Sequence, residues 1–392
     1  MNLPTYAEVV VVGAGPTGLA LAATLRRAGL DVLVFDKLAE GANTSRAAVI
    51  HARTLEVLAE LDVTRRLVDE GIVVPVFTIR DRDRVLARLE FDGLPTPHPY
   101  TLMLPQSRTE AILSQRLHEL GGMVHRPWAV TAATATPDGA TVTVADPDGA
   151  DQTVRARFVV GADGLHSVVR TSAGIGFTGD QYAASFVLAD VELTWPLPTR
   201  EVQLFLSPDG LVVVAPLPGG RHRIVATVDD APEAPGLELV QQLLDHRGPD
   251  GAAVHGLRWS SRFRVQHRVA DRYRSGALFV AGDAAHVHSP AGGQGMNTGI
   301  QDAIDLGHTL TEVLTGRQPE PFLDGYEARR RPIAQQVVQL TDQATRMATV
   351  PGRIPRAARN LVLSAVTRIP QVRRRLTMQI AELAPVGPSA NR

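Results

Sequence analysis

The stretch that decides the fold is "AEVVVVGAGPTGLALAATLRRAGLDVLVFDK", residues 7–37. Its unbroken β-branched run, Val9–Val12, predicts a strand that is buried on both faces. An Ala- and Leu-rich helix is predicted over 17–28 and a second strand over 31–35. A strand, a glycine turn, a helix and a strand in this order are typical of a parallel sheet with crossover helices.

Three glycines in the turn complete the pattern GxGxxG. Gly13 permits a tight turn, Gly15 lets a pyrophosphate approach the backbone, and Gly18 allows the helix to pack closely on the strand. The predicted helix begins at Thr17, and Pro16 and Thr17 are candidate contacts to the cofactor. Its N-terminus would offer free backbone N–H groups and a positive dipole end to phosphates. The turn therefore predicts dinucleotide binding.

An acidic residue, Asp36, ends the second strand 18 residues after Gly18. It would accept hydrogen bonds from the hydroxyls of an adenosine ribose, and Lys37 lies in the same nucleotide-binding region. A carboxylate here would repel a 2′-phosphate, which favours NAD or FAD over NADP. The motif alone does not separate NAD from FAD.

Two later stretches repeat the design of a strand followed by a turn. In "RFVVGADGLHSVVR", residues 157–170, a buried strand leads into Asp163-Gly164, which by itself is an ordinary turn. In "GALFVAGDAAHVHSP", residues 276–290, an apolar strand leads into Gly282-Asp283. A carboxylate at the end of a parallel strand can hold a chain of hydroxyls through charge-assisted hydrogen bonds.

A glycine-rich loop follows the third motif. Gly292, Gly293 and Gly295 would bring bare backbone close to a flat molecule. A helix is predicted over 298–314, and its N-terminus would stabilise negative charge that develops on that molecule.

Composition excludes several classes of function. The formal net charge of the 392 residues is −1, which argues against nucleic acid as the main partner. No cysteine occurs, so disulfides, thiolate catalysis and cysteine-ligated metal are excluded. His286 and His288 have no acidic cluster beside them, so we expect no metal. A secretory leader and a spanning segment are not recognisable, which predicts a cytoplasmic protein without a membrane partner.

The middle of the chain predicts a second, sheet-rich domain. Four alternating segments, 186–195, 202–205, 211–216 and 223–228, read as antiparallel strands. Near the end, arginines are predicted to lie on exposed helix faces, and docking of an acidic carrier or an anionic ligand is the alternative. These arginines are Arg353, Arg356, Arg359, Arg368, Arg373, Arg374 and Arg375.

Taken together, the three motifs resemble the single-component flavoprotein aromatic hydroxylases, the para-hydroxybenzoate hydroxylase-like FAD monooxygenases. The likeness is greatest to bacterial polyketide and antibiotic hydroxylases and covers residues 5–345. It implies an α/β fold in which a Rossmann-like FAD-binding domain is interleaved with a sheet-rich substrate domain and followed by C-terminal helices. The implied boundaries are 1–75, 101–180 and 270–332 for FAD, 76–100 and 181–269 for substrate, and 333–392 for a helical tail without the thioredoxin-like domain of many relatives.

The resemblance also implies the roles of individual residues. Asp283, preceded by Gly282, would bind the ribityl chain, and Asp163 with Gly164 would support the phosphates. Pro290 and His288 would lie near the reactive edge of the flavin. The remaining implied flavin contacts are Arg46, Gln106 and the nearby Arg108, with backbone N–H groups of Gly293, Gly295, Met296 and Asn297.

In this family the sheet forms the substrate pocket. The candidate lining residues are Phe205, Val213 and Pro216 from the sheet, with His98 and Tyr100 from the shorter piece. Burial in the core is the alternative for the aromatic residues among them.

The implied reaction consumes NADPH or NADH and dioxygen, and inserts one oxygen atom into an aromatic or polyketide-type molecule through a flavin hydroperoxide. The sequence has no second GxGxxG, so the nicotinamide cofactor would bind transiently, and no catalytic base can be named. One alternative is an FAD oxidoreductase of the same fold that transfers no oxygen. Another is a non-catalytic flavin- or ligand-binding protein. A monomer or a homodimer is expected.

Overall fold

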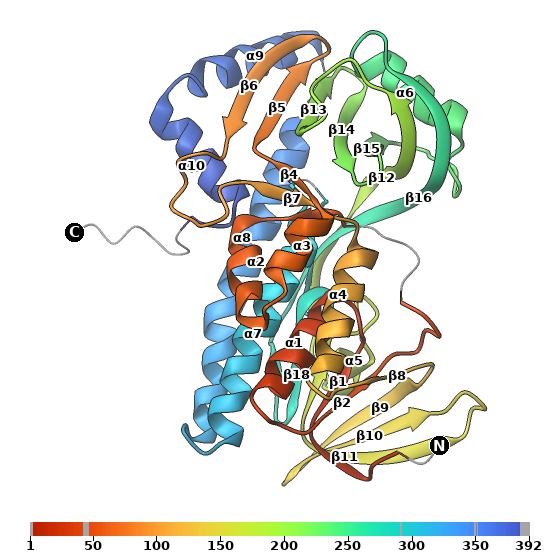
Figure 1. The fold of residues 1–392 in the computed structure, drawn as a ribbon, viewed down its shortest axis with the longest axis vertical. Helices are drawn as coiled ribbons and strands as arrows, with labels where there is room; N and C mark the ends of the chain where they lie inside the picture. Colours follow the sequence, from red (N-terminus) through yellow and green to blue (C-terminus); the bar gives the residue numbers. More distant parts are fainter. Residues whose placement is uncertain (1–2, 42–46, 291, 349, 351, 385–392) are drawn as a thin grey trace.

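The computed structural model of the protein describes residues 3–41, 47–290, 292–348, 350 and 352–384. A parallel sheet and long helices occupy one end, and an antiparallel sheet with the last helices occupies the other (Figure 1). This mixed architecture confirms the predicted fold class.

The first sheet contains the predicted Rossmann-like strands. Its order is β17-β18-β11-β1-β2-β8, with parallel pairing throughout except between β17 and β18, and β9 and β10 extend it as an antiparallel pair beside β11. The strands are β1 (Tyr6–Val12), β2 (Val32–Phe35), β8 (Val124–His125), β9 (Ala129–Thr136), β10 (Gly139–Ala145), β11 (Asp151–Gly161), β17 (Arg274–Ser275) and β18 (Leu278–Val280).

Parallel pairing brings the three motifs to one edge of this sheet. The backbone N–H of Ala162 donates to the carbonyl of Val12 at 2.8 Å, and that of Ala281 donates to Gly161 at 3.0 Å. The turns after β1, β11 and β18 are therefore neighbours, as the carboxyl ends of parallel strands must be.

Two helices start at this edge and pack on each other. They are α1 (Pro16–Arg27) and α7 (Gly295–Leu314), with α4 (Gln106–Glu119) on the other side of α1. A Cβ atom on Gly282 or on Gly299 would lie 2.5 Å from the hydroxyl of Thr17, so only glycine permits this approach. Helix α7 begins one turn earlier than the predicted Thr298, and its first turn belongs to the glycine-rich loop.

The second sheet is antiparallel apart from the β13–β5 pair and has the order β19-β16-β12-β15-β14-β13-β5-β6. Strands β12 and β16 run down toward the first sheet (Figure 1), and α6 (Leu237–Arg247) covers one face of the second. Its strands are β5 (Val76–Asp81), β6 (Arg84–Glu90), β12 (Phe177–Thr194), β13 (Glu201–Ser207), β14 (Gly210–Leu217), β15 (Arg221–Val228), β16 (Ala253–Ala270) and β19 (His286–Val287).

Short elements join the two parts. A three-stranded sheet has the order β3-β7-β4. The connecting elements are β3 (Val49–Ile50), α2 (Ala52–Leu58), α3 (Thr64–Glu70), β4 (Ile72–Val74), β7 (Thr101–Met103), α5 (Val168–Ser172) and the 3₁₀ turns η1 (Ala59–Leu61), η2 (Gly282–Ala284) and η3 (Glu320–Leu323).

The chain ends in helices α8 (Asp324–Ala348), α9 (Arg353–Val366) and α10 (Pro370–Ile380). The expected boundary after Pro332 falls inside α8, because this proline is accommodated within the helix. Residues 385–392 of the expected tail lie outside the described residues. No helix in the described part of the chain is both long enough and apolar enough to cross a bilayer.

A buried carboxyl after α10 makes the stability of this end depend on pH. Glu382 accepts hydrogen bonds from the side chains of Gln301 and Thr54, while its Oε1 has no partner among the described residues. Burial raises the pKa of Glu382 to about 8. The unfolded chain ionises this group near pH 4.5, whereas the folded chain does so near pH 8, so the free energy of unfolding falls as the pH rises between these values.

We expect Glu382→Gln to raise the free energy of unfolding by about 1–3 kcal/mol at pH 9 and to leave it unchanged at pH 4. The amide keeps a hydrogen-bonding side chain without the cost of burying a charge. Thermal unfolding of both proteins at the two pH values checks this, and an equal gain at both would contradict the assigned titration.

Candidate active site

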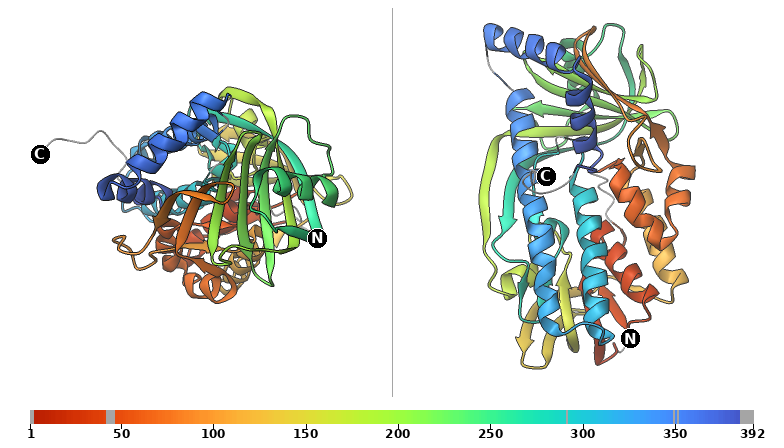
Figure 2. Two further views of the ribbon diagram at one scale, coloured as in Figure 1. Left: turned by 90° about the horizontal axis from the view of Figure 1, so that it is seen from above. Right: turned by 90° about the vertical axis from the view of Figure 1, so that its left-hand side faces the viewer.

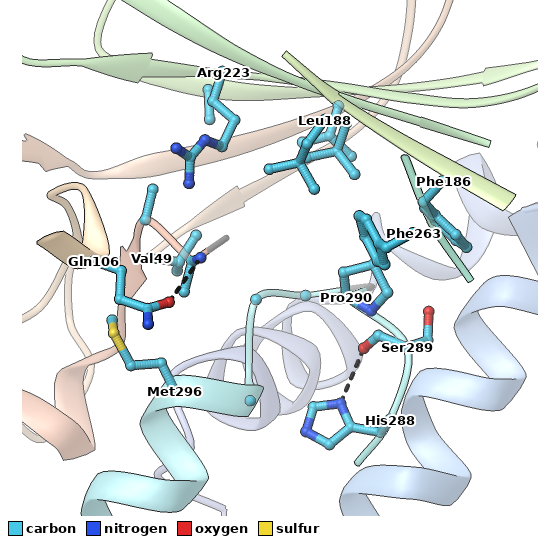
Figure 3. Close-up of a pocket in the computed structure, with 18 of the residues that line it drawn as sticks. Val49, Gln106, Phe186, Leu188, Arg223, Phe263, His288, Ser289, Pro290 and Met296 are labelled. Atoms are coloured by element: carbon cyan, nitrogen blue, oxygen red, sulfur yellow. Dashed lines mark hydrogen bonds between the residues drawn. The ribbon is translucent and has the colours of Figure 1, made fainter. Parts of the chain in front are cut away.

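The three motifs and the second sheet enclose a cavity of about 430 Å³. Its floor is made by the glycine turns and the start of α7, and its roof by strands of the second sheet (Figure 3). The lining residues include Gly15, Pro16, Thr17, Ala48, Val49, Gln106, Gly164, Asp283, Pro290, Gly293, Gly295 and Met296 below, and Phe77, Phe186, Leu188, Leu204, Val213, Arg223 and Phe263 above.

The first glycine turn has the geometry that its sequence predicts. Gly13 has φ +98°, and a Cβ there would lie 2.4 Å from the carbonyl oxygen of Ala162. A Cβ on Gly18 would lie 1.9 Å from the carbonyl oxygen of Gly13. Gly15 instead faces open space, with no atom within 4 Å of such a Cβ. The space in front of Gly15 fits a pyrophosphate at the N-terminus of α1.

Asp36 holds the glycine turn. Its carboxylate accepts hydrogen bonds from the N–H groups of Ala14 at 2.7 Å and Leu38 at 2.8 Å, and pairs with Arg126 at 3.0 Å. Arg126 also donates to the carbonyl of Ala14. The sequence does not predict that Arg126 lies here, because Arg126 belongs to the loop after β8. Lys37, which follows Asp36, is exposed. Binding of ribose by Asp36 stays a prediction.

The second motif positions Gly164. The carboxylate of Asp163 accepts hydrogen bonds from the backbone N–H groups of Val168 at 2.7 Å and Val169 at 3.4 Å, and its burial raises its pKa. Asp163 thus caps α5 and does not line the cavity, while Gly164, with φ +81°, does. Only Oδ2 makes these two bonds, while Oδ1 has no partner among the described residues, and support of the phosphates by Asp163 stays a prediction.

The glycine-rich loop is fixed from behind by two side chains. The amide of Asn297 donates to the carbonyls of Val49 and Gly293 at 2.8 Å and accepts from the N–H of His51 at 2.8 Å. The Nε2–H of His51 donates to the carbonyl of Gly292 at 2.8 Å, and burial lowers the pKa of His51 to about 4. A neutral imidazole and an amide therefore hold the loop without a charge.

Gly295 and Met296 line the cavity, and the first turn of α7 leaves backbone N–H groups without intrahelical partners. An electron-rich ring edge that lay against this turn would receive these donors. Asn297 also lies in this first turn, and the predicted contact of its backbone N–H with the flavin stays a prediction, since the bonds described above use its side chain.

His288 and Pro290 both lie in the wall of the cavity, and their position at the reactive edge of the flavin stays a prediction (Figure 3). Its Nδ1–H donates to the carbonyl of Ser289 at 2.9 Å, so Nε2 carries the lone pair of the neutral ring. Burial lowers the pKa of His288 to about 4. The neighbouring His286 is bound to Asp302 at 2.6 Å, which in turn accepts from Arg330.

A buried ion pair in the roof is the main feature that sequence reasoning missed. Arg223 donates to Asp190 from Nε at 2.7 Å and from a terminal nitrogen at 2.9 Å. Both side chains are almost fully buried, and Arg223 lines the cavity among apolar residues. The two residues face each other across β12 and β15, which come from distant parts of the sequence, so the pairing appears only once the sheet is known.

Of the five predicted substrate residues, only Val213 lines the cavity. The side chain of Phe205 lies instead on the other face of the sheet, against Trp195 and the residues under α6. Alternation in β13 places Leu204 on the cavity side and Phe205 opposite, and sequence alone does not say which face α6 covers.

The other three substrate candidates also lie outside the lining. Pro216 follows the lining residue Ala215 by one position and is not itself part of the wall. His98 and Tyr100 form a pair in the loop before β7, with 3.2 Å between Nδ1 and the phenol oxygen, and do not reach the cavity.

The two predicted flavin residues on α4 point in different directions, because they lie two positions apart on the helix. Gln106 lines the cavity and accepts from the N–H of Ala47. Arg108, two positions further, points away and pairs with Glu70 at 2.7 Å on the surface. Arg46 lies outside the described residues.

Comparison with known proteins identifies the family. The model of the FAD binding domain family matches residues 6–341. An uncharacterised aromatic compound monooxygenase of Bacillus subtilis is 37% identical over 96% of this chain and 75% of its own length. Rifampicin monooxygenase of Streptomyces venezuelae is 38% identical over 92% of this chain and 75% of its length.

Solved structures agree with this assignment. The anhydrotetracycline hydroxylase OxyS of Streptomyces rimosus superposes with a TM-score of 0.83 at 35% identity, over 99% of this chain and 78% of that one. Both the cavity and the first glycine turn fall within residues 6–341, which the family model matches. The chain therefore belongs to the FAD-binding aromatic monooxygenase family, close to the bacterial antibiotic and polyketide hydroxylases.

Proposed function

We propose that the protein uses FAD, NADPH or NADH, and dioxygen to hydroxylate an aromatic or polyketide-type small molecule. The observation that carries this proposal is a single cavity that joins a dinucleotide-binding turn to an apolar pocket under a sheet. Two relatives are named as monooxygenases of rifampicin and of anhydrotetracycline, and these names support an aromatic or polyketide-type substrate.

The residues present fit FAD. The open space at Gly15 suits the pyrophosphate, Asp283 and Gln106 suit the ribityl hydroxyls, and the first turn of α7 suits the ring. When bound, the flavin supplies the redox chemistry and the activation of dioxygen. The chain has to bind it, orient the substrate and exclude water.

The roof of the cavity is suited to excluding water and to orienting the substrate. Its lining is mainly aliphatic and aromatic, which keeps water away from reactive species. Arg223 adds a cation that Asp190 holds in one orientation. A guanidinium in such surroundings favours a substrate with a carbonyl, phenolate or carboxylate oxygen, since charge-assisted hydrogen bonds are strongest away from water.

The test begins with the absorption spectrum of the purified protein after incubation with FAD. Oxidation of NADPH under air is then followed with and without a panel of phenolic polyketides. In a second experiment the reaction runs under isotopically labelled dioxygen, and the product masses are measured by mass spectrometry. We expect flavin absorption, stimulation of NADPH oxidation by a ligand, and a product that carries one labelled oxygen atom.

Each alternative has its own result. Ligand-stimulated NADPH oxidation without labelled product would favour an oxidoreductase that transfers no oxygen. A yellow protein that never oxidises NADPH or NADH would favour a flavin-binding protein. Failure to take up FAD at all would overturn the proposal.

A further inference from the structure

Helix α9 has its apolar side turned to solvent. Its small and branched apolar residues recur at intervals of three and four, which is the spacing of one helix face. Every member of this outer face is exposed, and Ile354 and Leu361 are 84% and 67% exposed. The outer face consists of Ile354, Ala357, Ala358, Leu361, Val362, Ala365 and Val366 on α9, with Ile369 in the turn that follows the helix.

The polar side of α9 faces the protein instead. Asn360 donates to the carboxylate of Asp81 at 2.8 Å, and Ser364 donates to the carbonyl of Leu86 at 3.1 Å. Arg359, predicted to lie on an exposed face, donates to the last carbonyls of α8. These contacts fix the orientation of α9 on the protein. The apolar face is therefore exposed although the helix is docked.

The helix lies on the outside of the molecule in both views of Figure 2. An exposed, continuous apolar face of this kind is typical of a surface that binds something. Because the helix stands on the outside of the molecule, the face suits insertion into a soft surface.

The charges that the α9–α10 segment itself carries are all positive, and the acid that contacts α9, Asp81, does so on the inner side of the helix. Residues 343–381 contain eight arginines and no aspartate or glutamate, in a chain whose formal net charge is −1. Arg368, Arg374 and Arg375 are exposed beside or just beyond α9. A second copy that paired through this face would bring together two segments that each carry only arginines as charged residues between 343 and 381, whereas an anionic surface would be attracted.

We propose that α9 and the start of α10 bind the surface of an anionic lipid bilayer, with the outer face in the headgroup region and the arginines on the lipid phosphates. The sequence predicted no membrane partner because no segment is apolar enough to span a bilayer. A helix that lies in the interface needs only an apolar face and flanking cations.

This position would bring the substrate cavity next to the bilayer. Leu363 of α9 packs in one cluster with Leu204, Leu211 and Val213, which line the cavity from the other side. If the proposed function holds, apolar aromatic substrates dissolved in the bilayer would be concentrated near the cavity wall. Binding to lipid does not depend on that function.

Vesicle sedimentation of the FAD-loaded protein tests the proposal, with vesicles of phosphatidylcholine alone and mixed with phosphatidylglycerol. We expect binding to the mixed vesicles only, weakened by salt. Leu361→Glu/Val362→Glu should weaken it more than tenfold, and Arg374→Gln/Arg375→Gln about fivefold for each arginine removed.

The matched control is Met123→Glu, at an apolar side chain that is 57% exposed far from α9, before β8. It should bind like the wild type, and all variants should keep the same unfolding midpoint. Absence of binding, or equal binding to neutral vesicles, would overturn the proposal. So would a dimer in light scattering that Leu361→Glu/Val362→Glu converts to monomers, because a second copy would then cover the outer face.

Discussion

Replacing Gly15 by valine is expected to lower the affinity for FAD by more than about a hundredfold while the apoprotein stays folded. The glycine has φ −76° and ψ −176°, which valine adopts without strain. No protein atom lies within 4 Å of the new Cβ, so the side chain meets nothing in the protein itself. It would occupy the space that a pyrophosphate needs to reach the N–H groups of α1.

Gly236→Val is the matched control for this variant. Gly236 also caps a helix N-terminus, α6, with φ −82° and ψ 170° and with no atom within 4 Å of a Cβ. The two substitutions therefore cost the same at the cap, and only Gly15→Val should lose FAD. Titration of each apoprotein with FAD, followed by flavin fluorescence, measures the affinity, and thermal unfolding measures the fold. Unchanged affinity in Gly15→Val would show that FAD does not lie at this turn.

The contrast between Gly15 and Asp163 shows what sequence can predict about this site. GxGxxG is a pattern whose turn and helix start are largely set within the stretch: Gly18 closely approaches the carbonyl of Gly13, and Gly15 stays open, while only the contact of Gly13 with Ala162 comes from a distant part of the chain. Asp163 is also local, but an acid before a helix can cap that helix or meet a ligand. The sequence does not decide between these uses; in the structure Oδ2 caps α5, while Oδ1 has no partner among the described residues.

The sheet-rich part was predictable as strands but not as a pocket. Alternation marks two faces of β13 equally well, so the choice between Leu204 and Phe205 depends on where α6 packs. Helix α8 shows the same limit, because a proline normally ends a helix and Pro332 does not. Packing of α8 on α7 and β16 comes from distant parts of the chain and outweighs the local preference.

Replacing Arg223 by methionine is expected to lower the free energy of unfolding by about 3–5 kcal/mol, because it leaves the carboxylate of Asp190 buried without its partner. The double variant Arg223→Met/Asp190→Leu should recover most of this loss, since apolar residues of similar volume replace a buried ion pair at little cost. Arg221→Met, two residues earlier on β15 and half-buried, should change the value by less than about 0.5 kcal/mol. Urea unfolding of the four proteins measures these differences.

Activity separates the structural role of Arg223 from its role toward substrate. If the guanidinium only stabilises the sheet, the double variant should regain ligand-stimulated NADPH oxidation together with its stability. If it also orients the substrate, the double variant should fold normally and bind FAD, yet show a KM for the stimulating ligand about tenfold or more above the wild type, as expected when a charged hydrogen bond is lost. We expect the second result, because Arg223 is a charged group among the apolar residues of the cavity roof.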